Sequence, residues 1–291
     1  MAINKPTQNK IKDLKMEYER LRLGKESLLK ILDEAELSEN VYNSNAIENS
    51  TLTLKETEKI LLDLEISREI SVREVFEAKN LAKVMEYVGK KALEVEINKE
   101  AILFLHKILI SNINDNIAGR FRIIGEYVRV GTHIAPPPEH VELLIEGILN
   151  EYLSNFESYF IDKIAKFHLD FETTHPFVDG NGRIGRVLIN YQLLRFGFPP
   201  IIIRDKEKNF YYKSFGEYRD SKDTKSMEKI VSLALLESFH KRLAYLKGGK
   251  IITLTDYAKK NKKSVSALLN SARRQTIPVF REKGVWKIAD F

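Results

Sequence analysis

The stretch HPFVDGNGRIGR, residues 175–186, decides how this chain folds, because it separates two segments with helical periodicity. Residues 161–174 place one buried stripe on a single helical face, formed by Ile161, Ile164, Ala165, His168 and Phe171. Residues 183–196 predict a second helix, which Gly197 and two prolines bring to an end. A short loop rich in glycine and charge should therefore join two packed helices.

Outside this loop, most of the chain repeats apolar residues at three- and four-residue spacing and gathers its eight prolines at a few places. Between residues 120 and 134 the pattern changes to that of a short extended hairpin, carried by residues 127–130 with Gly125 and Gly131 beside them and ended by residues 136–138. The predicted fold class is mainly α, a helical core with a small β-hairpin and a further module at the carboxyl end.

Composition excludes several classes of protein. The 291 residues are 43% hydrophobic, enough for a substantial core, and include no cysteine, which excludes disulfides and thiolate chemistry. No segment has the apolar length that spanning a bilayer requires, and the first residues lack the apolar run of a signal peptide. We therefore expect a cytoplasmic protein with no membrane partner.

Charge is distributed unevenly along the chain. Residues 251–291 carry nine Lys or Arg against three acidic residues, which accounts for the whole net charge of +6. Such a basic segment favours a polyanionic partner. The segment also follows the flexible linker 247–250, and its sequence predicts a winged helix-turn-helix. Thr255 would cap a helix that runs to residue 260, and Ser264 would cap another that runs to residue 274. Residues 277–288 would form a hairpin that turns at residues 283 and 284.

The loop has the side chains of a polyphosphate site. Gly180 and Gly182 allow successive backbone N–H groups to face one anion, and the following helix adds the positive end of its dipole. Arg183 and Arg186 lie three residues apart on the first turn of that helix, and guanidinium groups suit phosphate oxygens. Asp179 is a hard oxygen ligand suited to Mg²⁺ held together with substrate phosphates.

His175 is the candidate general base, because a neutral imidazole accepts a proton near neutral pH. Taken alone, a histidine is usually structural and a Gly-x-Gly sequence is usually only a turn. Their combination with a carboxylate and two arginines within twelve residues favours a catalytic site instead. The lysine of a Walker phosphate loop is missing.

This loop resembles the signature of the Fic family, His-Pro-Phe-x-Asp/Glu-Gly-Asn-Gly-Arg-x-x-Arg, at all nine specified positions. The resemblance extends from about Val41 to about Tyr245. It implies a protein adenylyltransferase in which a Ser, Thr or Tyr hydroxyl of a target protein attacks the α-phosphate of ATP and pyrophosphate leaves. His175 would deprotonate that hydroxyl and Asp179 would hold Mg²⁺, the implied cofactor.

The resemblance also implies which residues bind ATP, with Arg183 on the leaving-group side and Arg186 at the γ-phosphate. The implied ATP-binding residues are Gly180, Asn181, Gly182, Arg183, Ile184, Gly185, Arg186, Tyr211 and Tyr212. The two tyrosines resemble a pair near the adenine, with core aromatics on a helix face as the alternative. Arg219 departs from the asparagine that relatives often carry near the nucleoside.

Two further segments resemble family features. Residues 126–134 resemble a flap that docks the target's extended chain by strand addition, with Val130 and Thr132 as candidate contacts. Ser44, Glu48 and Asn49 fit the family's inhibitory motif, which places Glu48 against Arg186. The alternative for Glu48 is a solvated helix residue.

The predicted regions are a regulatory helical region over 1–95, a catalytic core over 96–246 and the module over 251–291. Residues 264–274 would be the recognition helix of a DNA reader, with Arg273, Arg274 and Lys287 near phosphates, and the alternative is a basic domain that packs on the body or another protein. Rival functions are AMP removal, transfer of another phosphate-linked group, and a DNA-binding regulator that senses nucleotide. A homodimer is compatible with the sequence.

Overall fold

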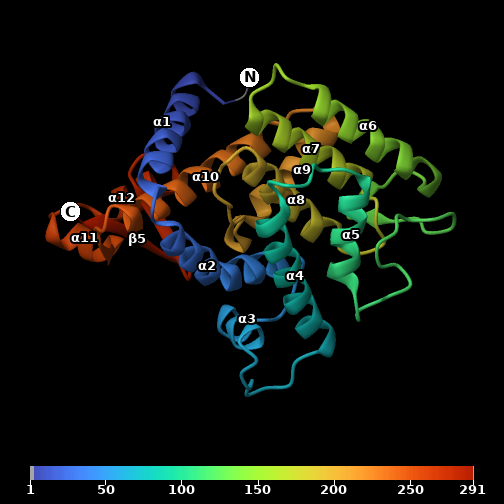
Figure 1. Cartoon of the computed structure of the whole chain (residues 1–291), viewed down its shortest axis with the longest axis horizontal. Helices are drawn as coiled ribbons and strands as arrows, with labels where there is room; N and C mark the ends of the chain where they lie inside the picture. Colours follow the sequence, from blue (N-terminus) through green and yellow to red (C-terminus); the bar gives the residue numbers. More distant parts are fainter. Residues whose placement is uncertain (1–2, 291) are drawn as a thin grey trace.

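The computed structural model describes residues 3–290, and it is mainly helical (Figure 1). The helices of the main body are α1 (Lys5–Arg22), α2 (Glu26–Ile47), α3 (Leu54–Leu61), α4 (Val72–Lys91), α5 (Lys99–Ile110), α6 (Val141–Ser154), α7 (Phe160–Thr174), α8 (Asn181–Arg195), α9 (Lys208–Ser221) and α10 (Lys225–Leu246). Two short 3₁₀ turns, Pro138–His140 and Asp205–Glu207, precede α6 and α9. No helix within residues 3–290 combines the length and apolar character that crossing a membrane requires.

Helices α7 and α8 lie at the centre of the body and contribute to both of its apolar cores (Figure 1). One core joins them to α1, α2, α9 and α10, and the other joins them to α2, α4, α5 and α6. The predicted α7 stripe is confirmed, since all five of its residues are buried. The loop 175–186 is therefore held between two helices that the core fixes on several sides.

The predicted helix ends are close to the observed ones. Helix α7 begins one residue earlier than expected, and α8 spans Asn181–Arg195 where 183–196 was expected. The earlier start of α8 follows from Gly180, whose φ of 82° turns the backbone directly into the helix. The Asn181 side chain stabilises this turn, because it accepts from the N–H of Phe177 at 2.9 Å and donates to the carbonyl of Phe177 at 2.8 Å.

The hairpin is shorter than the sequence predicted. Strand β1 (Arg129–Val130) pairs antiparallel with β2 (His133–Ile134), and the preceding residues 127 and 128 lie outside the strands. The segment before β1 turns instead of extending, because Glu126 accepts from the N–H of Ile123 at 2.9 Å and forms a two-pronged ion pair with Arg120. Arg120 and Glu126 thus stabilise a turn that strand propensity does not reveal.

The carboxyl-terminal module contains a three-stranded antiparallel sheet that packs against two helices. Its elements are β3 (Lys250–Thr253), α11 (Leu254–Lys260), α12 (Val265–Arg273), β4 (Val279–Glu282) and β5 (Val285–Asp290), with strand order β3-β5-β4. The module has a small core of its own, formed by Leu254, Ala258, Leu268, Ala272, Val279 and Ile288. It lies beside α1, α2 and α10 in Figure 1.

For this module one strand was missed, one predicted cap was wrong and two predictions are confirmed. Strand β3 was not predicted, because the run Lys250–Thr253 is short and pairs with residues about 35 to 40 positions away. Thr253 caps α11 by accepting from the N–H of Asp256, so the predicted cap at Thr255 is two residues too late. Ser264 caps α12 as predicted, and β4 and β5 turn at residues 283 and 284 as predicted.

Candidate active site

His175 follows α7 in a left-handed conformation, with φ of 49° and ψ of 62°. Its N–H donates to the carbonyl of Phe171 at 2.9 Å, and its carbonyl accepts from Nε of Arg122 at 2.8 Å. Both contacts stabilise a backbone conformation that a non-glycine residue rarely adopts. Burial, the largest cause, lowers the pKa of His175 to about 4. The imidazole is therefore neutral at neutral pH, as a general base requires.

His106 of α5 supports the far side of the loop. Its Nδ1 accepts from the N–H of Gly119 at 3.0 Å, so its Nε2 carries the proton that the carbonyl of Asp179 accepts at 3.0 Å. The ring stacks on Phe177 with a centroid separation of 3.6 Å. Burial lowers the pKa of His106 to about 4, so this histidine is a neutral structural support and not a charged ligand.

The side chains of Asp179 and Arg183 meet at the start of α8. One carboxylate oxygen of Asp179 accepts from the N–H of Gly180 at 2.6 Å and from Nη2 of Arg183 at 3.0 Å. Arg183 is buried and also pairs with Glu77 of α4 at 3.1 Å, while Arg73 of α4 contacts the other oxygen of Asp179. The loop and α4 therefore bring two guanidinium groups and two carboxylates into one contact network.

Asp179 suits a magnesium ion bound together with nucleotide phosphates. Its side chain remains about one-third exposed, and although burial raises its pKa, the guanidinium groups of Arg183 and Arg73 outweigh burial and hold the pKa below its usual range. The carboxylate is therefore ionised. Mg²⁺ commonly takes one or two carboxylates and completes its shell with water and phosphate oxygens, so a single aspartate here fits that mode. Arg73, which is about half exposed, would have to yield the oxygen that it contacts.

Arg186 lies on the next turn of α8 and is occupied by the end of α2. Its Nε donates to Oγ of Ser44 at 2.9 Å, and its Nη2 donates to the carbonyl of Ser44 at 2.7 Å and to Oε1 of Glu48 at 2.8 Å. The contact of Glu48 with Arg186 that the resemblance implied is present. A Cβ on Gly182 would come within 2.2 Å of that Glu48 oxygen, so the carboxylate rests on the first turn of α8.

Asn49 does not reach Arg186. Its φ is 68°, and its side-chain oxygen accepts from Nζ of Lys208 at 2.7 Å. This contact joins the end of α2 to the start of α9. Asn49 therefore holds the end of α2 in place from outside the contact between Glu48 and Arg186.

The two tyrosines lie in different surroundings. Tyr211 is buried, with its hydroxyl 2.8 Å from Nε2 of His168 and accepting from Nη1 of Arg186 at 3.4 Å. Tyr212 is 38% exposed and donates to the carbonyl of Ile47 at 2.9 Å. Tyr211 thus contacts Arg186 from within the core, whereas Tyr212 is partly exposed beside the end of α2.

The remaining loop residues pack inward. The side chain of Ile184 is fully buried in the core. A Cβ on Gly185 would come within 2.4 Å of Oε1 of Glu172 and 2.8 Å of His168, so glycine is needed for close packing of α8 on α7. Burial, aided by the nearby charge of Glu48, raises the pKa of Glu172 to about 8. Glu172 is therefore neutral at pH 7, and the ion pair of Arg186 is formed with Glu48.

The candidate flap residues of the hairpin are exposed, and the hairpin contacts the end of α7. Val130 is 42% exposed and Thr132 is exposed at the turn between β1 and β2. Nε2 of His133 donates to the carbonyl of Thr173, at the end of α7, at 2.8 Å. The edge of the hairpin therefore lies next to the segment that ends in His175.

Sequence reasoning missed Arg122, which joins the flap to His175. Besides the His175 carbonyl, its guanidinium donates to the carbonyls of Glu126 at 3.0 Å, Pro136 at 2.9 Å and Thr174 at 3.3 Å, and its own N–H donates to the carbonyl of Pro176 at 2.9 Å. Arg122 is buried at 3% exposure. Nothing in its local sequence distinguishes it from a surface arginine, because its partners are backbone groups from other segments.

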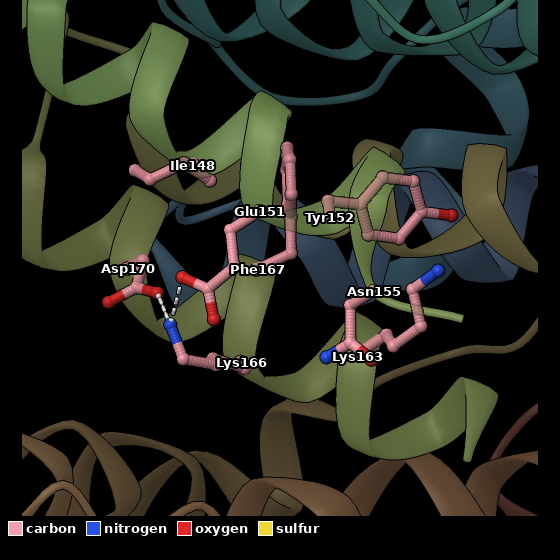
Figure 2. A pocket seen from close by; sticks show the side chains of 8 residues that line it. All are labelled: Ile148, Glu151, Tyr152, Asn155, Lys163, Lys166, Phe167 and Asp170. Atoms are coloured by element: carbon pink, nitrogen blue, oxygen red, sulfur yellow. Dashed lines mark hydrogen bonds and ion pairs between the residues drawn. The ribbon is translucent and has the colours of Figure 1, made fainter. Parts of the chain in front are cut away.

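A hollow between α6 and α7 is not part of this site (Figure 2). It holds about 20 Å³, roughly the space of one water molecule, and Lys166 closes it by pairing with Glu151 and Asp170 at 2.7 Å each. None of its lining residues belongs to 175–186 or to the end of α2. Its size and position exclude it as a nucleotide site.

Comparison with known proteins agrees with this architecture. Residues 96–193 match the family model described as the Fic/DOC family. A protein adenylyltransferase Fic of Nematostella vectensis is 32% identical over 180 residues, which are 60% of this chain and 42% of that protein. A Fic domain containing signaling protein from Bacteroides thetaiotaomicron superposes with a TM-score of 0.73 at 25% identity, covering 82% of this chain and 97% of that one.

A Fic family protein from Desulfovibrio desulfuricans has a TM-score of 0.68 at 20% identity and covers 99% of this chain and 97% of that chain, which shows a likeness of fold. The mainly helical body with a small hairpin and a small carboxyl-terminal sheet is a Fic fold. Residues 96–193 thus match the Fic/DOC family model, and the chain is related in sequence to proteins named protein adenylyltransferase Fic. The matched region spans about two fifths of the curated Nematostella relative, at 42% of its length.

Proposed function

We propose that this protein transfers AMP from ATP to a hydroxyl of a target protein and that Glu48 inhibits the transfer. The observation that carries the proposal is the placement of a neutral, partly buried His175 at the start of a loop that goes on to present Asp179, Arg183 and Arg186. The relatives named adenylyltransferases support the same activity. The proposed regions are 1–95 for regulation, 96–246 for catalysis and 251–291 for the carboxyl-terminal module.

In the proposed reaction, Nε2 or Nδ1 of His175 takes the proton of the target hydroxyl as its oxygen attacks the α-phosphate, and the bond to pyrophosphate breaks. The N–H groups at the start of α8, in a turn that the Asn181 side chain stabilises, orient the phosphates, and Arg183 balances charge on the leaving group. Mg²⁺, held by Asp179, would supply further charge neutralisation. Val130 and Thr132 would pair with the target's backbone beside His175.

The proposed inhibition follows from the contacts of Arg186. Glu48 occupies the guanidinium that would bind the γ-phosphate, and its negative charge lies on the first turn of α8, where phosphates would bind. The carboxylate of Glu48 and the phosphates of ATP would repel each other, so ATP would bind weakly or in a displaced position while Glu48 contacts Arg186. Ser44 keeps Arg186 oriented independently of Glu48.

The proposed activity is tested by incubating the protein with ATP labelled on the α-phosphate, Mg²⁺ and cell lysate, followed by mass spectrometry of labelled proteins. Addition of AMP to Ser, Thr or Tyr residues supports the proposal. Transfer of label only from a γ-labelled nucleotide, or removal of AMP from a premodified protein, would favour the rival phosphate-group chemistries.

Arg122→Lys is expected to lower AMP transfer at least about tenfold in the Glu48→Gly background while ATP affinity stays within twofold. Lysine keeps the charge, but its single ammonium group cannot serve four carbonyls from three segments, so His175 and the flap lose their common support. Misplacement of a catalytic group by about 1 Å can cost a hundredfold in rate. Initial rates and nucleotide affinity would be measured together with thermal stability.

Arg120→Lys is the matched control for this experiment, since Arg120 pairs with Glu126 near the same turn but donates to no carbonyl of the loop 175–186. An unchanged rate for Arg122→Lys would show that Arg122 does not position His175. Equal losses for both variants would assign the effect to the flap turn alone.

A DNA-reading role for the carboxyl-terminal module is a second candidate function. Arg273 and Arg274 are exposed at the end of α12. Lys287, which was expected near phosphates, instead pairs with Glu282 at 2.6 Å, and Arg281 pairs with Glu237 of the body at 2.6 Å. The module therefore packs on the body, which was the alternative to a DNA reader. Arg273 and Arg274 at the end of α12 nevertheless stay exposed.

If the module reads DNA, Arg273→Gln/Arg274→Gln should reduce the affinity of the full chain for a duplex. The salt slope should fall by roughly 0.9 for each phosphate that the variant no longer neutralises. Fluorescence anisotropy with a labelled duplex at several salt concentrations measures both quantities. Lys287→Gln, which removes a paired lysine, is the control. No affinity in the unmodified chain at low salt would leave protein interaction as the role of this module.

A further inference from the structure

A buried chain of ion pairs connects the carboxyl-terminal hairpin to helix α2. Arg281 of β4 pairs with Glu237 of α10 through both carboxylate oxygens, at 2.6 and 3.0 Å, and its N–H donates to the same carboxylate at 3.0 Å. Glu237 also pairs with Arg204 at 2.9 Å, and Arg204 in turn pairs with Glu39 of α2. Glu39, Arg204 and Glu237 are each 5 to 6% exposed.

The hairpin also contacts α2 directly. The N–H of Gly284, at the turn between β4 and β5, donates to Oε1 of Glu39 at 3.2 Å. A parallel route runs through Lys241 of α10, which pairs with Glu36 of α2 at 3.1 Å and with Glu282 of β4 at 3.4 Å. Glu36 and Glu39, one turn apart on α2, thus bind groups that the module either donates, as Gly284 does, or contacts itself, as with Lys241.

The same helix carries the inhibitory residues. Helix α2 runs without interruption from Glu26 to Ile47, and Glu48 is its C-cap residue. The nine residue steps from Glu39 to Glu48 span about 13.5 Å along the axis, at a rise of about 1.5 Å per residue. A displacement of α2 at Glu39 therefore moves Ser44 and Glu48 relative to Arg186, because a helix transmits motion along its axis as a rigid element.

We propose that the carboxyl-terminal module holds α2 in its inhibitory position through Arg281, Arg204 and Glu39, and that loosening this contact activates the enzyme. The inference rests on the proposed inhibition by Glu48. Without Arg281, Glu237 is paired with Arg204 alone. The positive charge of Arg204 must then balance both Glu237 and Glu39, so the charge of Glu39 is less well compensated. A buried carboxylate without adequate partners favours a shift of its helix toward water, which withdraws Glu48 from Arg186.

The test uses the full chain, labelled ATP and Mg²⁺, with Arg281→Gln introduced into the wild type and into the Glu48→Gly variant. We expect Arg281→Gln to raise the transfer rate at least threefold in the wild type and to add less than twofold in the Glu48→Gly background. Glu39→Gln, which alters the α2 end of the same chain, should behave similarly. Lys260→Gln, which disturbs a surface pair with Asp290 within the module, is the matched control and should leave the rate unchanged.

The outcomes separate this inference from the proposed inhibition. If Glu48→Gly activates but neither Arg281→Gln nor Glu39→Gln does, the coupling is wrong and inhibition by Glu48 stands. If Glu48→Gly itself gives no activation, the proposed inhibition is wrong, and the coupling that rests on it is wrong as well. Rates that fall in both backgrounds, or rise equally in both, would also overturn the coupling.

Hydrogen exchange gives a readout that does not depend on catalysis. We expect faster exchange of the amides at residues 44–49 in Arg281→Gln than in the wild type, with unchanged exchange in α7 and α8. Unchanged protection of residues 44–49 would overturn the coupling even if the rate rose.

Discussion

His175→Ala should lower AMP transfer at least ~10²-fold, the usual contribution of a general base, while leaving ATP affinity nearly unchanged. The imidazole acts on the target hydroxyl, whereas the groups proposed to bind phosphates belong to residues 179–186. Rates would be measured in the Glu48→Gly background so that inhibition does not mask the loss, and ATP affinity would be measured by calorimetry. A folded His175→Ala variant with near-normal transfer would refute the assigned role.

The pH dependence tests the same role more finely. Because burial lowers the pKa of His175 to about 4, the imidazole remains neutral as the pH falls from 8 to about 5 and gains a proton only below that range. Loss of the base should therefore begin below about pH 5 and not near its ordinary value of ~6.5. ATP affinity must be followed at each pH, since the terminal phosphate also titrates. A fall in rate centred near 6.5 at constant ATP occupancy would contradict a base whose pKa is lowered by its surroundings.

Glu48→Gly should activate transfer at least about tenfold. Removing the carboxylate frees one Nη2 contact of Arg186 for the γ-phosphate, and the remaining contacts with Ser44 keep the guanidinium in place. A charge-assisted hydrogen bond contributes roughly 1.5 to 3 kcal/mol, and each ~1.4 kcal/mol of barrier changes the rate tenfold. Self-modification and target modification with labelled ATP and Mg²⁺ measure the effect.

Two further variants show how Glu48 acts. Glu48→Gln keeps the size of the side chain but removes its charge, so partial activation would assign part of the inhibition to repulsion of phosphate. The Glu48→Gly/His175→Ala double variant should be inactive. If Glu48→Gly is no faster than the wild type, inhibition by this helix is wrong.

The sequence by itself predicted the central helix pair and the loop between them. Apolar spacing along 161–174 and the glycine and prolines after 196 are local signals, and they located α7 and α8 to within about two residues. The candidate site residues 175–186 could be found for the same reason, since they are neighbours in the chain and their spacing is visible without a fold. Their catalytic roles stay predictions until they are tested.

Only the tertiary structure decided the contacts between distant segments. Arg122 and His106 support the loop through backbone carbonyls and N–H groups from other elements, and such partners leave no side-chain pattern in the sequence. Strand β3 depends on pairing with β5 and not on its own four residues. The position of the basic module against α2 depends on buried charges at residues 39, 204, 237 and 281. Hydrophobic periodicity is set by neighbours in the chain, whereas burial of a charge is stable only where folding brings its partners together.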